Sequence, residues 1–140
     1  MNRPLRQALL LCGLSLIPTG ISASLHRDIL LDAAGRLQPG EISLENVSTA
    51  PSPVLWVDAR PQKDYEQEHV PGALLLNEQG WDTQVVQVLD QWKPGQWVVV
   101  YCSSTACKAS HQVAAQLREL DVEPVYVLRG GWERWKKEAR

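Results

Sequence analysis

The hydrophobic pattern of this chain alternates between short apolar runs and segments that are expected to be helical. Four apolar runs have the length of buried strands, at residues 54–57, 73–76, 97–101 and 125–128. Four other segments are expected to form helices, at residues 61–68, 82–92, 108–120 and 132–137. This alternation predicts an α/β fold in which helices cover both faces of a mostly parallel sheet.

Local signals refine these elements. Asp82 is expected to cap the second helix, which Lys93-Pro94-Gly95 is expected to end. Residues 42–47 have the pattern of a short capped turn of helix before the first apolar run. One face of the third helix is expected to carry Val113, Ala114, Leu117 and Leu120.

Residues 1–23 have the layout of a secretory signal peptide. Arginines without an acidic residue occur in residues 1–7, residues 8–17 are almost wholly apolar, and small residues lead to Ala23. We therefore predict cleavage after Ala23 and export to the periplasm. The alternative is an uncleaved inner-membrane anchor, because residues 8–25 reach the roughly 17 to 25 residues that a spanning helix needs.

Cleavage would leave an acidic chain with one domain. The full chain has 14 basic and 16 acidic residues, and residues 1–23 contain two of the basic ones, so the remaining 117 residues carry a net charge of −4. This balance argues against nucleic acid as a partner. We assign residues 24–41 to an entry segment and residues 42–140 to the domain. A membrane is expected as a partner only if the N-terminal segment stays uncleaved, and no protein partner is indicated.

The candidate chemistry lies at the end of the third apolar run. Cys102 follows residues 97–101 directly, and a loop of small residues and a helix come next. This order places the thiol at the carboxyl end of a buried strand, facing a helix amino terminus. Such surroundings stabilise a thiolate or an oxyanion and lower a cysteine pKa from about 8.5 to roughly 3.5 to 7.5. The alternative is that Cys102 is only a small buried hydrophobic residue.

Cys107 and Lys108 end the same loop, and each allows two interpretations. Cys107 is expected either to resolve a modified Cys102 through an intraloop disulfide or to point into the helix packing without a role. Lys108 is expected either to guide an anionic donor or to be a surface lysine of the first helical turn. A structural disulfide framework is not expected, because cleavage removes Cys12 and leaves one possible pair. No metal is expected, since the potential ligands lack a convincing spacing.

Five motifs resemble those of one family when they are taken in order. They are Val57-Asp58-Ala59-Arg60, Tyr65, His69-Val70-Pro71-Gly72-Ala73, Val99-Val100-Tyr101-Cys102, and Leu128-Arg129-Gly130-Gly131-Trp132 with Trp135. Their order and spacing over about residues 42–137 resemble a rhodanese homology domain. The resemblance implies a five-stranded parallel sheet flanked by helices on both faces, and it implies sulfurtransferase activity.

In the chemistry that the resemblance implies, Cys102 attacks the outer sulfur of thiosulfate or another small sulfane donor and holds it as a persulfide. The sulfur then passes to a thiol or cyanide acceptor, without a metal or an organic cofactor. Backbone N–H groups of the following loop would stabilise the persulfide anion. The implied loop consists of Ser103, Ser104, Thr105, Ala106, Cys107 and Lys108.

Four residues from the other motifs are candidates for lining or supporting the pocket. Asp58 and Arg60 are expected to form a structural pair near the end of their strand, with an Arg60 that faces the site as the alternative. His69 is expected to be a turn histidine held by backbone, with a general base as the alternative. Trp132 is expected to form a wall of the pocket.

The loop departs from the family pattern, and this keeps other functions open. Many single-domain relatives have a glycine and then Arg-Ser after the cysteine, whereas this loop lacks glycine and has Lys108, so we expect a wider pocket, which puts thiosulfate itself in question. One alternative is a dithiol redox protein that uses Cys102 and Cys107. A second is a phosphatase or arsenate reductase, because Cys102 and Lys108 have the spacing of such loops, although lysine lacks the planar fork with which arginine holds phosphate.

Overall fold

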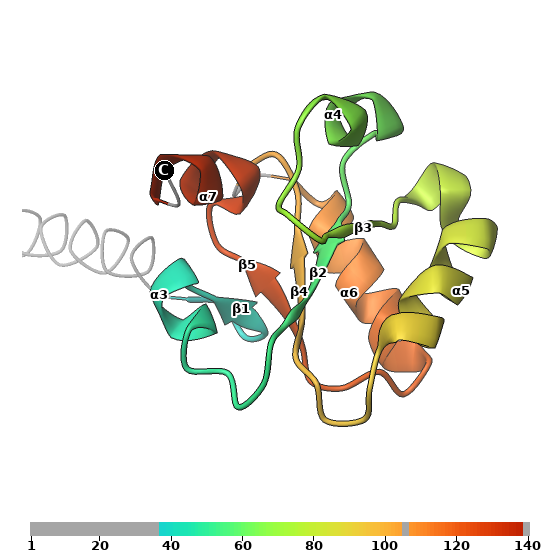
Figure 1. Cartoon of the computed structure of the whole chain (residues 1–140), viewed down its shortest axis with the longest axis horizontal. Coiled ribbons are helices and arrows are strands. Elements are labelled where there is room, and N and C mark those ends of the chain that lie inside the picture. The colour runs from blue at the N-terminus through green and yellow to red at the C-terminus, as the bar shows by residue number, and fades with distance from the viewer. Residues whose placement is uncertain (1–36, 105–106, 139–140) are drawn as a thin grey trace, which may run out of the picture. The chain divides into compact units, whose positions relative to one another are not determined.

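The computed structural model describes residues 37–104 and 107–138, so the predicted signal peptide lies outside the described residues. Five strands form one parallel sheet in the order β1-β5-β4-β2-β3 (Figure 1). The strands are β1 (Glu41–Ile42), β2 (Leu55–Asp58), β3 (Leu74–Leu75), β4 (Val98–Tyr101) and β5 (Val125–Leu128). The predicted α/β fold with a five-stranded parallel sheet is confirmed.

Helices lie on both sides of this sheet. They are α3 (Leu44–Val47), α4 (Gln62–Gln67), α5 (Trp81–Gln91), α6 (Ala109–Glu119) and α7 (Gly131–Glu138), with a 3₁₀ turn η1 (Glu78–Gly80) before α5. Figure 1 shows α5 and α6 on one side of the strands and α3 and α7 on the other. None of the helices in the described part of the chain is long and apolar enough to span a bilayer.

The central strand β4 connects the two halves of the core. All four of its residues are buried. Val98 and Val100 belong to a cluster that α5 and α6 also line, whereas Val99 and Tyr101 belong to a second cluster that α3 and α7 line. Successive side chains of a strand point to opposite faces, so a strand that is apolar at every position needs cover on both sides. The turn that follows β4 is therefore anchored by packing on two faces.

The start of α5 differs from the prediction. Asp82 does not cap this helix, because it already lies in the first turn, and Gly80 occupies the cap position without a side-chain hydrogen bond. The helical path begins earlier, in η1, where the Asn77 side chain accepts a hydrogen bond from the Gly80 N–H at 3.0 Å. Asn is a favoured capping residue, and here it caps the 3₁₀ turn rather than the α-helix.

Residues 42–47 form a strand residue followed by a helix rather than one helical turn. Ile42 belongs to β1 and pairs with Leu128 of β5. The helix α3 begins after Ser43, whose hydroxyl accepts a hydrogen bond from the Asn46 N–H at 3.4 Å. A strand of two residues has no periodic pattern of its own, so only its pairing with β5 reveals it.

One residue of the predicted buried face of α6 is exposed. Val113, Ala114 and Leu117 are buried as predicted, but Leu120 is 46% exposed. Leu120 is the cap residue after the end of α6, so it no longer follows the helical repeat.

Candidate active site

Cys102 lies immediately after β4 and is buried, with 4% of its surface exposed. Its carbonyl oxygen accepts a hydrogen bond from the Trp132 N–H at 2.7 Å, and the Ser103 carbonyl accepts one from the Glu133 N–H at 3.2 Å. Both donors belong to the first turn of α7, where N–H groups have no partner within the helix. The amino end of α7 therefore holds the backbone on which Cys102 sits.

This close approach depends on Gly131, the first residue of α7. Its φ of 55° lies in the left-handed region that favours glycine. A Cβ at this position would collide with the carbonyl oxygen of Cys102 and would lie 3.1 Å from its carbonyl carbon. The paired glycines of the last motif are a local signal of a tight turn, but the sequence does not show that Gly131 lies against Cys102.

Cys102 and Cys107 form a disulfide in the structure, with their Cα atoms 6.1 Å apart. This separation lies in the range of about 4.4 to 6.8 Å that is usual for disulfides. The Cys107 N–H donates to the Ser104 carbonyl at 3.2 Å, and the Ser110 hydroxyl donates to the Cys107 carbonyl at 3.4 Å. Of the two interpretations of Cys107, the structure therefore agrees with pairing and not with a thiol that points into the helix packing.

The remaining loop residues lie between β4 and α6, as the sequence predicted. Ser103 and Lys108 are exposed, and Ser104 is partly buried. Lys108 occupies the N-cap position of α6, where no side-chain hydrogen bond caps the helix. Thr105 and Ala106 lie outside the described residues. An exposed lysine and the amino end of α6 thus directly follow Cys107 along the chain.

Asp58, the last residue of β2, and Arg60 form the predicted pair at the end of this strand. Arg60 Nη2 lies 2.7 Å from Asp58 Oδ2, and both side chains are buried. Arg60 also donates to the Glu68 carbonyl at 2.7 Å, so the buried charges have further hydrogen bonds that they need for stability. Burial lowers the pKa of Arg60, but the hydrogen bond and charge of Asp58 outweigh it and raise that pKa above its ordinary value.

Tyr101 links this ion pair to the turn at Cys102. Its hydroxyl donates to Asp58 Oδ2 at 2.6 Å and accepts a hydrogen bond from the Val70 N–H at 3.1 Å. Burial raises the pKa of Tyr101, and the neighbouring Asp58 carboxylate raises it further. In the sequence, Tyr101 ends an apolar run and belongs to the motif that leads to Cys102. No local signal indicates a contact with a residue 43 positions away.

The guanidinium of Arg60 packs against the ring of Trp132. The Arg60 guanidinium carbon lies 4.5 Å from the centre of the Trp132 ring, within the range of a cation–π contact. Trp132 also stacks on Trp135, with ring centres 5.2 Å apart, and is 9% exposed. Arg60 therefore contacts Trp132, whose side chain packs in the second core cluster, and the role of Trp132 as a pocket wall stays a prediction.

His69 is held by backbone, as predicted for a turn histidine. Its Nδ1 lies 2.8 Å from the Tyr65 carbonyl oxygen, and its ring stacks on the Tyr65 ring at 3.9 Å. A carbonyl can only accept, so Nδ1 carries the proton in this contact. This arrangement holds the turn before β3 and directs Nδ1 away from any role as a base.

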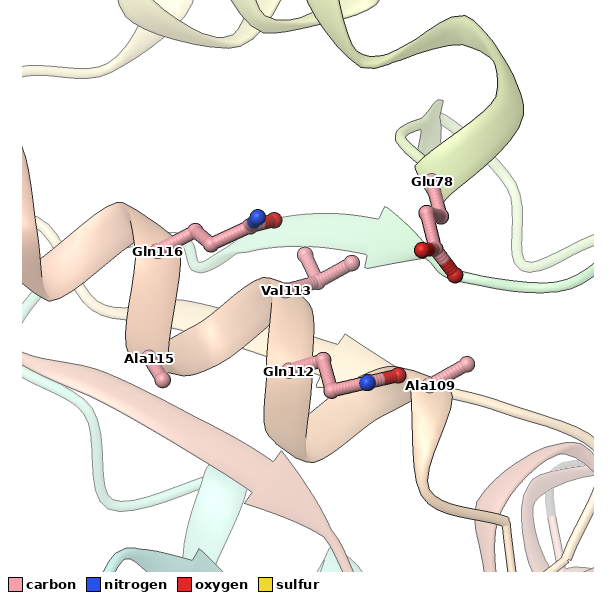
Figure 2. A pocket seen from close by; sticks show the side chains of 6 residues that line it. All are labelled: Glu78, Ala109, Gln112, Val113, Ala115 and Gln116. Atoms are coloured by element: carbon pink, nitrogen blue, oxygen red, sulfur yellow. The ribbon is translucent and has the colours of Figure 1, made fainter.

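A hollow of about 220 Å³ lies beside α6 and is separate from these residues (Figure 2). It is lined by Glu78, Ala109, Gln112, Val113, Ala115 and Gln116. Figure 2 shows Glu78 reaching toward α6 from the neighbouring 3₁₀ turn. The lining contains no nucleophile, so we do not assign the chemistry to this hollow. Within the described ranges, no group of three or more His, Cys, Asp or Glu side chains is arranged to hold a metal.

Comparison with known families relates this site to other proteins. The model of one family, the Rhodanese-like domain, matches residues 43–138. The chain belongs to the rhodanese-like domain family. This domain is also 36% identical over 83 residues to "Thiosulfate sulfurtransferase GlpE" from Coxiella burnetii. The aligned residues cover 59% of this chain and 72% of that protein. The match to the family includes every residue that the sequence analysis placed in the site.

Solved structures share the fold of this rhodanese-like domain at lower identity. A protein from Bacillus halodurans has a TM-score of 0.58 and 20% identity, covering 84% of this chain and 82% of that one. A rhodanese-like domain protein from Staphylococcus aureus has a TM-score of 0.52 and 21% identity, covering 68% and 89%. A rhodanese-related protein from Thermoplasma volcanium has a TM-score of 0.55 and 12% identity, covering 70% and 91%. At these identities the likeness concerns the fold alone.

Proposed function

We propose that this rhodanese-like domain is a sulfurtransferase in which Cys102 carries the sulfur as a persulfide. The observation that carries the proposal is the position of Cys102 between the end of β4, the loop before α6 and the amino end of α7. In an open parallel sheet, ligands bind outside the carboxyl ends of the strands, and Cys102 is the sulfur at that edge nearest the centre of the sheet. The similarity to a protein named thiosulfate sulfurtransferase supports the same class of reaction.

The proposed reaction has two steps. The Cys102 thiolate attacks the outer sulfur of a sulfane donor, and with thiosulfate the donor S–S bond breaks and sulfite leaves with the electron pair. A thiol or cyanide then attacks the outer sulfur of the persulfide, and the Cys102 thiolate leaves. The cysteine must be reduced for the first step, so the disulfide with Cys107 has to open before turnover.

Charge and backbone support an anionic donor at this position. Lys108 is exposed at the start of α6, and the amino end of a helix carries a partial positive charge. Backbone N–H groups that follow Cys102 would stabilise the outer sulfur of a persulfide, as an oxyanion hole stabilises oxygen. The Asp58–Arg60 pair and Tyr101 are joined by hydrogen bonds, and Tyr101 directly precedes Cys102, so we assign them a supporting role. We propose a small sulfane anion as donor, with thiosulfate as the first compound to test.

Intact mass spectrometry tests this proposal. Reduced protein that has been freed of reductant is exposed briefly to thiosulfate, and a persulfide adds about 32 Da to the chain. Cys102→Ser should show no addition, and Cys107→Ser serves as the matched control because it removes the neighbouring sulfur and keeps Cys102. Sulfur uptake that persists in Cys102→Ser would contradict the assignment of the nucleophile.

A second candidate function is a dithiol redox protein, which the Cys102–Cys107 disulfide favours. In that function the pair exchanges electrons with another thiol, and no sulfur atom is carried. The two functions differ in the same mass experiment. A chain that loses about 2 Da on reaction with a disulfide and never gains sulfur from a sulfane donor would favour the redox function.

The proposed place of action is the periplasm. This part rests on the signal peptide pattern of residues 1–23, with an inner-membrane anchor as the alternative. An oxidising compartment suits a loop whose two cysteines can form a disulfide.

A further inference from the structure

We propose that this domain also reduces sulfane sulfur to sulfide, because Cys107 attacks the Cys102 persulfide and expels its outer sulfur. The inference rests on the proposed persulfide and adds a second fate for it. In place of transfer to an external acceptor, the sulfur would leave as hydrosulfide, and the two cysteines would be left as the disulfide that the structure contains.

The geometry of the loop supports this attack. The Sγ atoms of Cys102 and Cys107 are bonded directly, so the loop allows Cys107 to reach the inner sulfur of a persulfide on Cys102. Cys107 is held in this position by the Ser104 carbonyl on one side and the Ser110 hydroxyl on the other. Neither contact needs the disulfide itself. The reduced loop can therefore keep Cys107 close to Cys102.

Burial also favours an attack from inside the loop. Cys102 is 4% exposed, and the amino end of α7 holds the backbone on one side of it. An external thiol must approach through the remaining opening, whereas Cys107 is only five positions along the chain. Intramolecular groups in good alignment react as if present at about 10⁵ M or more, far above any free thiol. Cys107 should therefore compete with acceptors in solution.

Both steps conserve atoms, charge and electrons. Thiosulfate and the Cys102 thiolate give sulfite and the Cys102 persulfide anion. The Cys107 thiol then attacks the inner sulfur, the S–S bond to the outer sulfur breaks, and the outer sulfur leaves with the electron pair and the proton of Cys107 as HS⁻. The products are the Cys102–Cys107 disulfide and hydrosulfide. Relative to the reduced enzyme, two cysteine thiols have been oxidised and one sulfane sulfur has been reduced.

Turnover then needs an electron donor, which we identify as a protein or small-molecule dithiol. One thiol of this reductant attacks the disulfide, and its second thiol releases the mixed disulfide, which restores both cysteines. Per cycle, thiosulfate and one dithiol yield sulfite, hydrosulfide, one proton and the oxidised dithiol. The domain would accordingly act downstream of a reaction that forms a sulfane sulfur and beside a system that supplies dithiols.

A single-turnover experiment tests this inference. Wild-type protein and Cys107→Ser are reduced, freed of reductant under anaerobic conditions and mixed with excess thiosulfate. Wild type should release about one sulfide per chain and end as the disulfide, about 2 Da lighter than the reduced chain. Cys107→Ser should release less than a tenth as much sulfide and should gain about 32 Da. Wild type without thiosulfate is the control for oxidation by other routes and should release none.

Addition of cyanide gives a second measurement that needs no variant. Cyanide competes with Cys107 for the persulfide, so rising cyanide should lower the sulfide yield of wild type and raise thiocyanate by an equal amount. A wild-type sulfide yield below a tenth per chain without cyanide overturns the inference, whatever Cys107→Ser does.

The outcomes separate this inference from the proposed function. A gain of about 32 Da in both wild type and Cys107→Ser, with no sulfide from either, would overturn the inference and leave the persulfide intact. No sulfur uptake by either protein, from thiosulfate or from glutathione persulfide, would overturn the proposed function and with it this inference.

Discussion

The contact between Gly131 and the backbone of Cys102 can be tested by adding one methyl group. Gly131→Ala introduces two effects, a side chain at a φ of 55° and a collision with the Cys102 carbonyl oxygen. The first effect costs about 1 to 2 kcal/mol for a residue with a Cβ. The second must move either α7 or the turn, which would weaken the 2.7 Å hydrogen bond from the Trp132 N–H. Loss of a buried hydrogen bond adds about 1 to 3 kcal/mol.

Gly95→Ala is the matched control for this substitution. Gly95 has a φ of 82°, and a Cβ there would meet no atom within 4 Å. It therefore carries the conformational penalty without the collision. We expect Gly95→Ala to lower the free energy of unfolding by about 1 to 2 kcal/mol and Gly131→Ala to lower it by about 2 to 5 kcal/mol.

Two assays check this prediction. Urea unfolding measures both stabilities, and the rate of sulfur uptake from thiosulfate measures the site. Displacement of the Cys102 backbone by about 1 Å should slow uptake in Gly131→Ala by roughly 10- to 100-fold, whereas Gly95→Ala should keep the wild-type rate. Equal stabilities and equal rates for the two variants would refute the role that we give to the amino end of α7.

Three further predictions concern the support, the charge and the export of the domain. Tyr101→Phe should lower the free energy of unfolding by about 2 to 4 kcal/mol in urea unfolding, because the Val70 N–H and Asp58 Oδ2 both lose a buried partner. A loss below about 0.5 kcal/mol would contradict this prediction. Lys108→Gln should raise the KM for thiosulfate about fivefold at low salt, as expected for about 1 kcal/mol of charge interaction, whereas the exposed Lys93→Gln at the opposite end of β4 should not. A KM that does not change with Lys108→Gln would mean that this lysine does not guide the donor. Finally, the intact mass of the exported protein should match a chain that begins at residue 24. A full-length, membrane-bound chain would favour the anchor.

Part of this molecule could be predicted from local patterns alone. The strands β2 to β5 and the helices α4 to α7 follow from apolar runs and helical spacing, which depend on neighbouring residues. The position of Cys102 after β4 follows from the same patterns, since a buried strand and the next helix bracket it. The Asp58–Arg60 pair could also be predicted from the sequence, because only one residue separates the two side chains along the chain.

Other features were decided only by the tertiary structure. The strand β1 exists because Ile42 pairs with Leu128, and neither residue carries a signal of the other. Gly131 approaches Cys102 only because β4 and β5 are neighbours in the sheet, which brings the start of α7 beside the turn after β4. The sequence by itself could therefore place Cys102, the proposed sulfur carrier, directly after the central strand, since that position depends on local order along the chain. The supports of that residue come from contacts between distant segments, and those contacts exist only once the sheet has formed.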